Sequence, residues 1–123
     1  MKNVDRITSS EKVEPFVNLD DGSYYYNYNV KEDGFVRYSE DEDSKPRYTF
    51  IQIRCWGKPD YKECVKNVIR KYITQDEEFD LINSANSIIL SGNIDENNTD
   101  IIKYKDYLKL VEEIKTNVKK DFE

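Results

Sequence analysis

Residues 47–72 read RYTFIQIRCWGKPDYKECVKNVIRKY, and the spacing of the apolar side chains changes within this stretch. Up to Trp56 the side chains alternate, with Thr49, Ile51, Ile53 and Cys55 on one face and Tyr48, Phe50, Gln52, Arg54 and Trp56 on the other. After Pro59 the apolar residues follow a helical repeat: Tyr61, Cys64, Val65, Val68, Ile69 and Tyr72. The stretch therefore predicts a strand followed directly by an amphipathic helix.

Upstream of this stretch the sequence is typical of strands and turns. Residues 24–30 alternate, with Tyr24, Tyr26, Tyr28 and Val30 on one face. Residues 31–34 end in Asp-Gly, which predicts a hairpin turn, and a second strand follows from Phe35 to Ser39. The acidic run Glu40–Asp43 then predicts a solvated loop. Together these patterns predict a small antiparallel sheet of about three strands.

The first 20 residues are mostly polar and have no sustained periodicity. We predict a lead-in, residues 1–20, that is flexible or ordered only on assembly, in which Val13–Leu19 could add an edge strand. Residues 21–123 then form a single domain.

Two further helices are predicted downstream. Thr74-Gln75-Asp76-Glu77 fits a capping box that opens a helix through about Leu90, with Phe79, Ile82, Ala85 and Ile89 directed inward. After a break at Ser91-Gly92, a last helix runs from about Asp100 to Lys120, with the stripe Tyr104, Tyr107, Leu108, Val111, Ile114 and Val118. The predicted fold is α+β: the sheet in the N-terminal half, followed by about three helices packed on it.

The composition excludes several classes of partner. The 123 residues include 19 Lys plus Arg and 25 Asp plus Glu but no His, giving a net charge of −6. An acidic chain without a basic stripe is repelled by nucleic acid and by anionic membrane surfaces, so we predict neither as a partner. No apolar run approaches the roughly 20 residues of a membrane span, and the N-terminus does not fit a signal peptide.

The residues also predict no catalytic centre, metal site or cofactor. Cys55 and Cys64 lie nine apart without any His or CxxC, which does not fit zinc, and Cys64 falls on the inward stripe of its helix, where a thiol is inert. The carboxylates of residues 77–80 suit the positive end of a helix. The acidic stretches 40–43 and 95–100 lack the glycine and glutamate of a calcium loop. We therefore predict a protein that is not an enzyme and takes no small-molecule substrate.

What remains is the aromatic content: ten Tyr, five Phe and one Trp. Tyr and Trp are effective interface residues because they combine a large area with few rotatable bonds. We predict partner-binding residues on the second face of the sheet: Tyr25, Tyr48, Phe50 and Trp56. The alternative is that these rings fill a thin core with their hydroxyl groups in water.

Residues 47–123 resemble a family of short phage proteins. The resemblance lies in Gly57-Lys58-Pro59-Asp60-Tyr61 and its helix, in Glu77-Glu78-Phe79-Asp80-Leu81, and in the closing helix from Tyr104 to Phe122. Similar sequences are uncharacterised proteins of phages and prophages of gut Bacteroidota, including crAss-like phages. The resemblance implies a virion-related or accessory role and supplies no functional residues.

These observations predict a non-enzymatic phage protein that acts through protein–protein contacts. The first hypothesis is a small virion or tail-associated component, bound to other virion chains or to copies of itself. The alternative is an acidic host-takeover protein that occupies the nucleic-acid groove of a host enzyme. The first places the chain in the virion, the second in the host cytoplasm.

Overall fold

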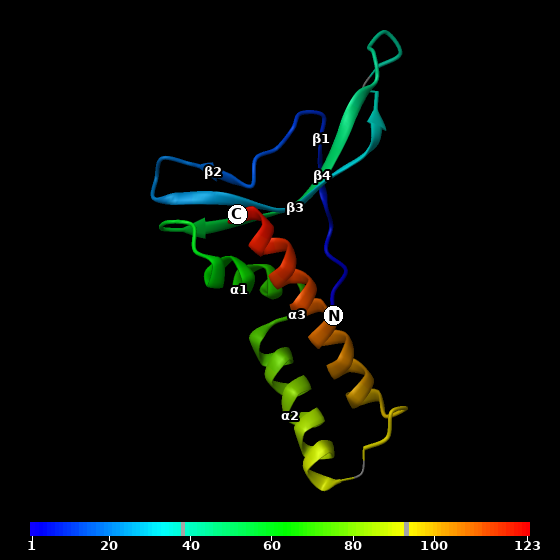
Figure 1. Ribbon diagram of the computed structural model, residues 1–123. Coiled ribbons are helices and arrows are strands. Elements are labelled where there is room, and N and C mark those ends of the chain that lie inside the picture. The colour runs from blue at the N-terminus through cyan, green and yellow to red at the C-terminus, as the bar shows by residue number, and fades with distance from the viewer. Residues whose placement is uncertain (38, 93) are drawn as a thin grey trace.

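The computed structural model describes residues 1–37, 39–92 and 94–123 and confirms the α+β class. In these residues a four-stranded antiparallel sheet, in the order β1-β4-β3-β2, is followed by three helices (Figure 1). The sheet has one strand more than predicted. The bounds are β1 Ile7–Ser9, β2 Phe16–Asn18, β3 Ser23–Val36, β4 Lys45–Trp56, α1 Tyr61–Tyr72, α2 Gln75–Ser91 and α3 Thr99–Asp121.

The predicted turn at residues 31–34 is wrong, because β3 runs through it to Val36. Asn29 and Gly34 both have positive φ, and the pairing with β4 shifts register between Tyr28 and Lys31 and again between Glu32 and Phe35. A left-handed residue suits a bulge as well as a turn, and here it makes bulges. The acidic run thus falls in the connection between β3 and β4. Of the strand predicted over 35–39, residue 38 lies outside the described residues.

The two bulged strands form an arm that projects beyond the rest of the sheet (Figure 1). Arg6 holds the base of this arm. Its Nη2 donates to the backbone oxygens of Asn29 at 2.5 Å and Thr49 at 2.7 Å, and its Nε donates to Thr49 Oγ1 at 3.1 Å. One guanidinium therefore bridges β3 and β4 next to the first register shift.

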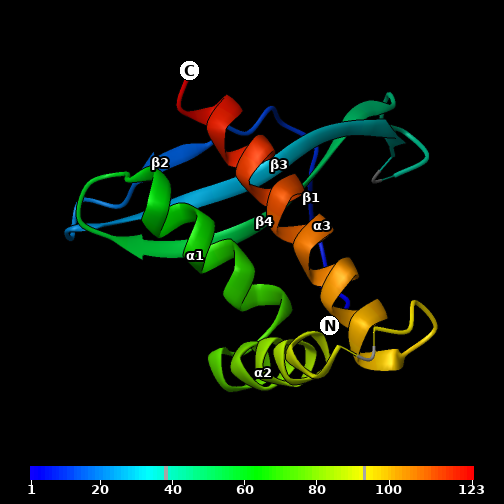
Figure 2. The ribbon, with the colours of Figure 1, turned by 60° about the horizontal axis from the view of Figure 1, so that its bottom comes forward.

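Residues 1–20, which we predicted as a lead-in, contribute two short strands to the sheet, β1 and β2. β1 pairs with β4 and β2 pairs with β3, so the segment covers both edges. The connection between β1 and β2 crosses the face opposite the helices (Figure 2). Backbone pairing holds this segment, and a search for apolar periodicity does not detect that kind of stabilisation. The edge strand that Val13–Leu19 suggested is confirmed as β2.

The core lies between the sheet and helices α1 and α3. It contains the predicted inner face of the two long strands, namely Tyr24, Tyr26, Tyr28, Ile51, Ile53 and Cys55, and the apolar stripe of α1. The tyrosine hydroxyls are bonded to the protein. Tyr26 donates to Asp121 Oδ2 at 2.6 Å, and Tyr28 accepts from Asn117 Nδ2 at 3.0 Å. Burial raises the pKa of both phenols.

Helix α2 begins and ends as predicted, but its predicted inward face is partly wrong. Thr74 Oγ1 accepts from the Glu77 N–H and donates to its carboxylate, and Gly92 ends the helix in the left-handed conformation. Ala85 is buried, yet Phe79 and Ile89 are exposed. α2 extends away from the sheet against α3 (Figures 1 and 2), so only the side facing α3 is covered. The spacing of apolar residues does not reveal which side that is.

Candidate protein-binding surface

The four predicted partner-binding residues lie on the sheet face opposite α1 and α3, but in different surroundings. β-pairing puts Tyr25 opposite Arg54 and Ser23 opposite Trp56, near the β2–β3 turn. Tyr48 and Phe50 lie opposite Ser9 and Ile7 of β1. Because Phe50 and Trp56 are six residues apart on one strand, about 20 Å separates them. The structure therefore does not unite the four residues in one surface.

The middle of this face is covered by the chain itself. Asn27 is buried, and it donates from Nδ2 to the Glu14 carbonyl at 2.9 Å and accepts from Gln52 Nε2 at 3.1 Å. Phe50 is only 4% exposed and Tyr48 is half-buried. Phe50 is thus a core residue, which corrects its assignment to a partner surface. The physical reason is that β1 pairs beside Phe50 and the connection from β1 to β2 crosses the middle of the face that the sequence left open.

The end of the face beside the β2–β3 turn is open. Trp56 is 68% exposed and Val17, which pairs with Tyr25, is 39% exposed. Directly opposite residues of neighbouring antiparallel strands share a face, so Val17, Tyr25 and Arg54 form one row across β2, β3 and β4. We call Val17, Tyr25, Arg54 and Trp56 the Trp56 patch.

The arginine of this patch is held in place. The Arg54 Cζ atom lies 5.0 Å from the centroid of the Trp56 ring, which is a cation–π geometry. Arg54 Nη2 pairs with Asp21 Oδ2 at 2.5 Å, and its Nε donates to Ser23 Oγ at 3.2 Å. Hydrogen bonds from the Ser23 hydroxyl and N–H, helped by Arg54, lower the pKa of Asp21. The exposed indole is therefore oriented by a network that starts in the β2–β3 turn.

Sequence reasoning missed two members of this patch. Arg54 alternates with Trp56 on one strand face, and that spacing is a signal that could have included it. Val17 is part of the Trp56 patch only because β2 pairs with β3, and no residue pattern near Val17 specifies that pairing.

Cys64, the cysteine predicted on the inward stripe of its helix, lies deep in the core. Cys64 is fully buried, its Sγ lies 3.6 Å from the Tyr24 hydroxyl oxygen, and burial raises its thiol pKa to about 11. At neutral pH this thiol is protonated and has no access to a substrate.

The carboxylates near the start of α2 have structural partners. Glu78 pairs with Arg70 at 3.0 Å and accepts from the Tyr107 hydroxyl. Burial opposes its ionisation, but these two hydrogen bonds outweigh that effect and lower its pKa. Glu77 belongs to the capping box.

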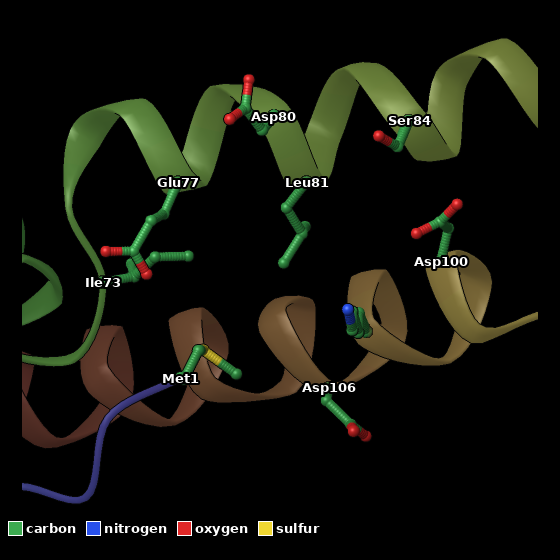
Figure 3. A pocket seen from close by; sticks show the side chains of 9 residues that line it. Met1, Ile73, Glu77, Asp80, Leu81, Ser84, Asp100 and Asp106 are labelled. Atoms are coloured by element: carbon green, nitrogen blue, oxygen red, sulfur yellow. The ribbon is translucent and has the colours of Figure 1, made fainter.

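A pocket of about 370 Å³ lies between α2 and α3 (Figure 3). Acidic side chains dominate its polar lining, which comprises Glu77, Asp80, Ser84, Asp100, Lys103 and Asp106; Met1, Ile73 and Leu81 complete the wall. Among the described residues no three metal-ligating side chains gather in one place, here or elsewhere. The helix start accounts for the acidic residues of α2.

The two acidic stretches also have structural roles. At the end of the arm Arg37 donates from Nε to the Glu42 carbonyl at 2.9 Å, and from Nη2 to the Glu40 carbonyl. Asn98 caps α3 by accepting from the Asp100 N–H at 2.9 Å. Each stretch shapes a chain reversal.

No protein-family model, curated protein or solved structure matches this chain. Within the described part of the chain, no helix combines the length and apolar content that crossing a membrane requires. The Trp56 patch therefore has to be interpreted from its own chemistry.

Proposed function

We propose that this protein acts without catalysis, by binding another protein chain through the Trp56 patch. One observation carries the proposal: a tryptophan that is two-thirds exposed is fixed by an arginine, itself held by an ion pair. The resemblance to phage proteins favours a virion or tail protein as the partner.

The residue types of the patch support this proposal. Trp, Tyr and Arg are the side chains most enriched among residues that dominate binding energy at protein interfaces. Here they project from paired strands, so little conformational entropy is lost when a partner covers them. Val17 adds an apolar contact beside Tyr25. The patch thus has the composition and the rigidity of an interface centre.

A matched pair of variants tests the proposal. Phe35, on the arm, is 73% exposed and offers a control aromatic residue of similar exposure. A photoreactive amino acid at position 56 is expected to cross-link one defined protein in cells that carry the gene, and the same group at position 35 is not. Trp56→Ala should weaken binding of that protein by about thirtyfold, corresponding to the roughly 2 kcal/mol of an interface hot spot, whereas Phe35→Ala should not. Equal binding by both variants would overturn the proposal.

Quantitative mass spectrometry of purified particles tests the finer part of the proposal. Many copies of the chain per particle, lost in the Trp56→Ala variant, are expected of a virion component. If no copies are found, the virion assignment is wrong while the Trp56 interface can still hold.

One feature favours the alternative of an acidic inhibitor. The run Glu40–Asp43 lies between the two strands of the projecting arm, where a groove of a host enzyme could receive it. The arm also carries Lys31, Arg37, Lys45 and Arg47, which dilute the negative field. Binding that weakens steeply with salt and is lost when residues 40–43 become Asn or Gln would support this alternative.

A further inference from the structure

The base of the arm contains a pocket into which three cationic side chains converge, those of Arg6, Lys31 and Arg47. Its volume is about 400 Å³, within the range of roughly 300–1,000 Å³ that is typical of small-molecule sites. The three residues come from different parts of the chain, so no pattern in the sequence reveals the cluster. The pocket shares no residue with the Trp56 patch, and an inference about it does not depend on the proposed function.

Strand pairing places these side chains on one face of the sheet. Thr8 of β1 and Lys31 of β3 both lie directly opposite Thr49 of β4, and directly opposite residues of antiparallel strands share a face. Arg47 precedes Thr49 by two residues on β4, which puts it on the same face. Arg6 reaches this face too, because its Nε donates to Thr49 Oγ1 at 3.1 Å. Two hydroxyl groups and three cationic groups therefore lie side by side at the base of the arm.

The bulge at Asn29 is what directs Lys31 into the pocket. Strict alternation from Tyr28 would put Lys31 on the other face of the sheet, but the register shift between these two residues returns it to the side of Thr49. Asn29 has a φ of 53°, a conformation that costs free energy in a residue other than glycine. Arg6 Nη2 donates to the Asn29 carbonyl and so fixes the bulge. Bulges often re-aim a side chain at a functional site, and this one sets an ammonium group beside two guanidinium groups.

The three cationic side chains have hydrogen-bond donors that the described residues do not use. Arg6 donates from Nε and Nη2, which leaves its Nη1 group without an acceptor. Lys31 makes no hydrogen bond or ion pair with any described residue. Arg47 Nε is buried and has no hydrogen-bond partner in this part of the chain. A buried donor without an acceptor costs free energy, so the unused donors indicate a ligand that supplies acceptors.

We propose that this pocket binds a phosphate group, either free phosphate or the phosphoryl group of a small phosphomonoester. Guanidinium, ammonium and hydroxyl groups are the donors that proteins use for phosphate oxygens. Asp33 pairs with Arg47 at 3.0 Å, so the three cations keep an excess of two positive charges on this face. A phosphate group carries about two negative charges at neutral pH and matches that excess, whereas a carboxylate carries one. Glu32 also lines the pocket, but it pairs with Tyr48, which is on the other face of the sheet.

A titration of the full chain with inorganic phosphate is the first test. Nuclear magnetic resonance should show saturable shifts of the Lys31 and Thr49 amides that sodium chloride of equal ionic strength does not produce. Lys31→Met should weaken phosphate binding by about tenfold, because it removes one charge-assisted hydrogen bond. Lys45→Met removes the same charge from an exposed position on the arm outside the pocket and should leave binding unchanged. An absence of saturable shifts, or equal losses in the two variants, would overturn the proposal.

A gain of affinity is the second test. Asp33→Asn removes the carboxylate that competes for Arg47, so phosphate should bind about two- to fivefold more tightly than to the wild type. Unchanged or weaker binding would overturn the assignment of the anion to this pocket. The same titration with glycerol phosphate distinguishes the two sources of the group. Tighter binding than that of inorganic phosphate would identify an organic phosphomonoester as the ligand, and equal or weaker binding would identify free phosphate.

Discussion

Helices α1 and α2 carry similar numbers of apolar side chains but use them differently. In α1, Cys64, Val65, Val68 and Ile69 are buried among 12 residues, whereas α2 buries Ala85 alone among 17. α1 lies across the sheet, whereas α2 packs mainly against α3 and contacts α1 through the Arg70–Glu78 ion pair (Figure 2). Apolar content therefore does not measure how much a helix contributes to the core. The position of a helix relative to the sheet decides that contribution. Apolar side chains that remain exposed are available for binding.

The largest expected effect concerns two isoleucines, one that packs against the sheet and one on α2 away from it. Ile114 of α3 is fully buried against the sheet side, and Ile89 of α2 is 41% exposed. Ile114→Ala should lower the free energy of unfolding by about 2–5 kcal/mol, because it leaves a cavity. Ile89→Ala should cost about 0.5 kcal/mol or less. Urea denaturation measures both. Similar losses would contradict the view that position relative to the sheet decides how much a helix residue stabilises the fold.

The next effect concerns the tyrosine hydroxyls of the core. Tyr26→Phe removes the donor that reaches Asp121 and leaves a half-buried carboxylate without that bond. The expected loss of unfolding free energy is about 1–3 kcal/mol. Tyr25→Phe, on the opposite face of the same strand, should change it by less than about 0.5 kcal/mol. If both variants unfold at the same urea concentration, the Tyr26 hydroxyl does not stabilise the fold.

The smallest effect joins the two regions. Glu78 of α2 pairs with Arg70 of α1, and its pKa is lowered from 4.5. A carboxylate with a lowered folded pKa stabilises the protein above its unfolded pKa, and this contribution is lost as pH falls through the folded value. Glu78→Gln should therefore lower unfolding free energy by about 1 kcal/mol at neutral pH. The difference from wild type should shrink below pH 4.5. Thermal unfolding followed from pH 7 to pH 3 checks this, and a difference independent of pH would contradict it.

Much of the fold could be predicted from the sequence because the determining signals are local. The alternation of Tyr24, Tyr26 and Tyr28, the helical stripe of α1 and the capping box at Thr74 all depend on neighbours within a few residues. The sheet edges could not be predicted in the same way. β1 pairs through backbone groups with residues about 40 positions away, and its three side chains carry no apolar pattern.

The candidate site was predictable only in part, for a related reason. Trp56 is exposed, Tyr25 is half-buried and Phe50 is covered, although all three share one sheet face. The difference arises because residues 10–15 cross the middle of that face and leave the end beside the β2–β3 turn free. Exposure at this surface depends on the path of a distant segment, and alternation along β4 does not encode that path.

The hydrogen bonds from Arg6 to β3 and β4 also have a consequence for the order of folding. A short connection joins β3 and β4. By contrast, the hydrogen bond between Arg6 and Thr49 joins residues 43 positions apart, and the one between Tyr26 and Asp121 joins residues 95 positions apart. Closing long loops is slow, so the hairpin of β3 and β4 should form first and residues 1–18 should dock afterwards. Until they dock, both edges of the nascent sheet are unpaired. That interval is when two chains are most able to join by strand pairing, and fast docking of Arg6 shortens it.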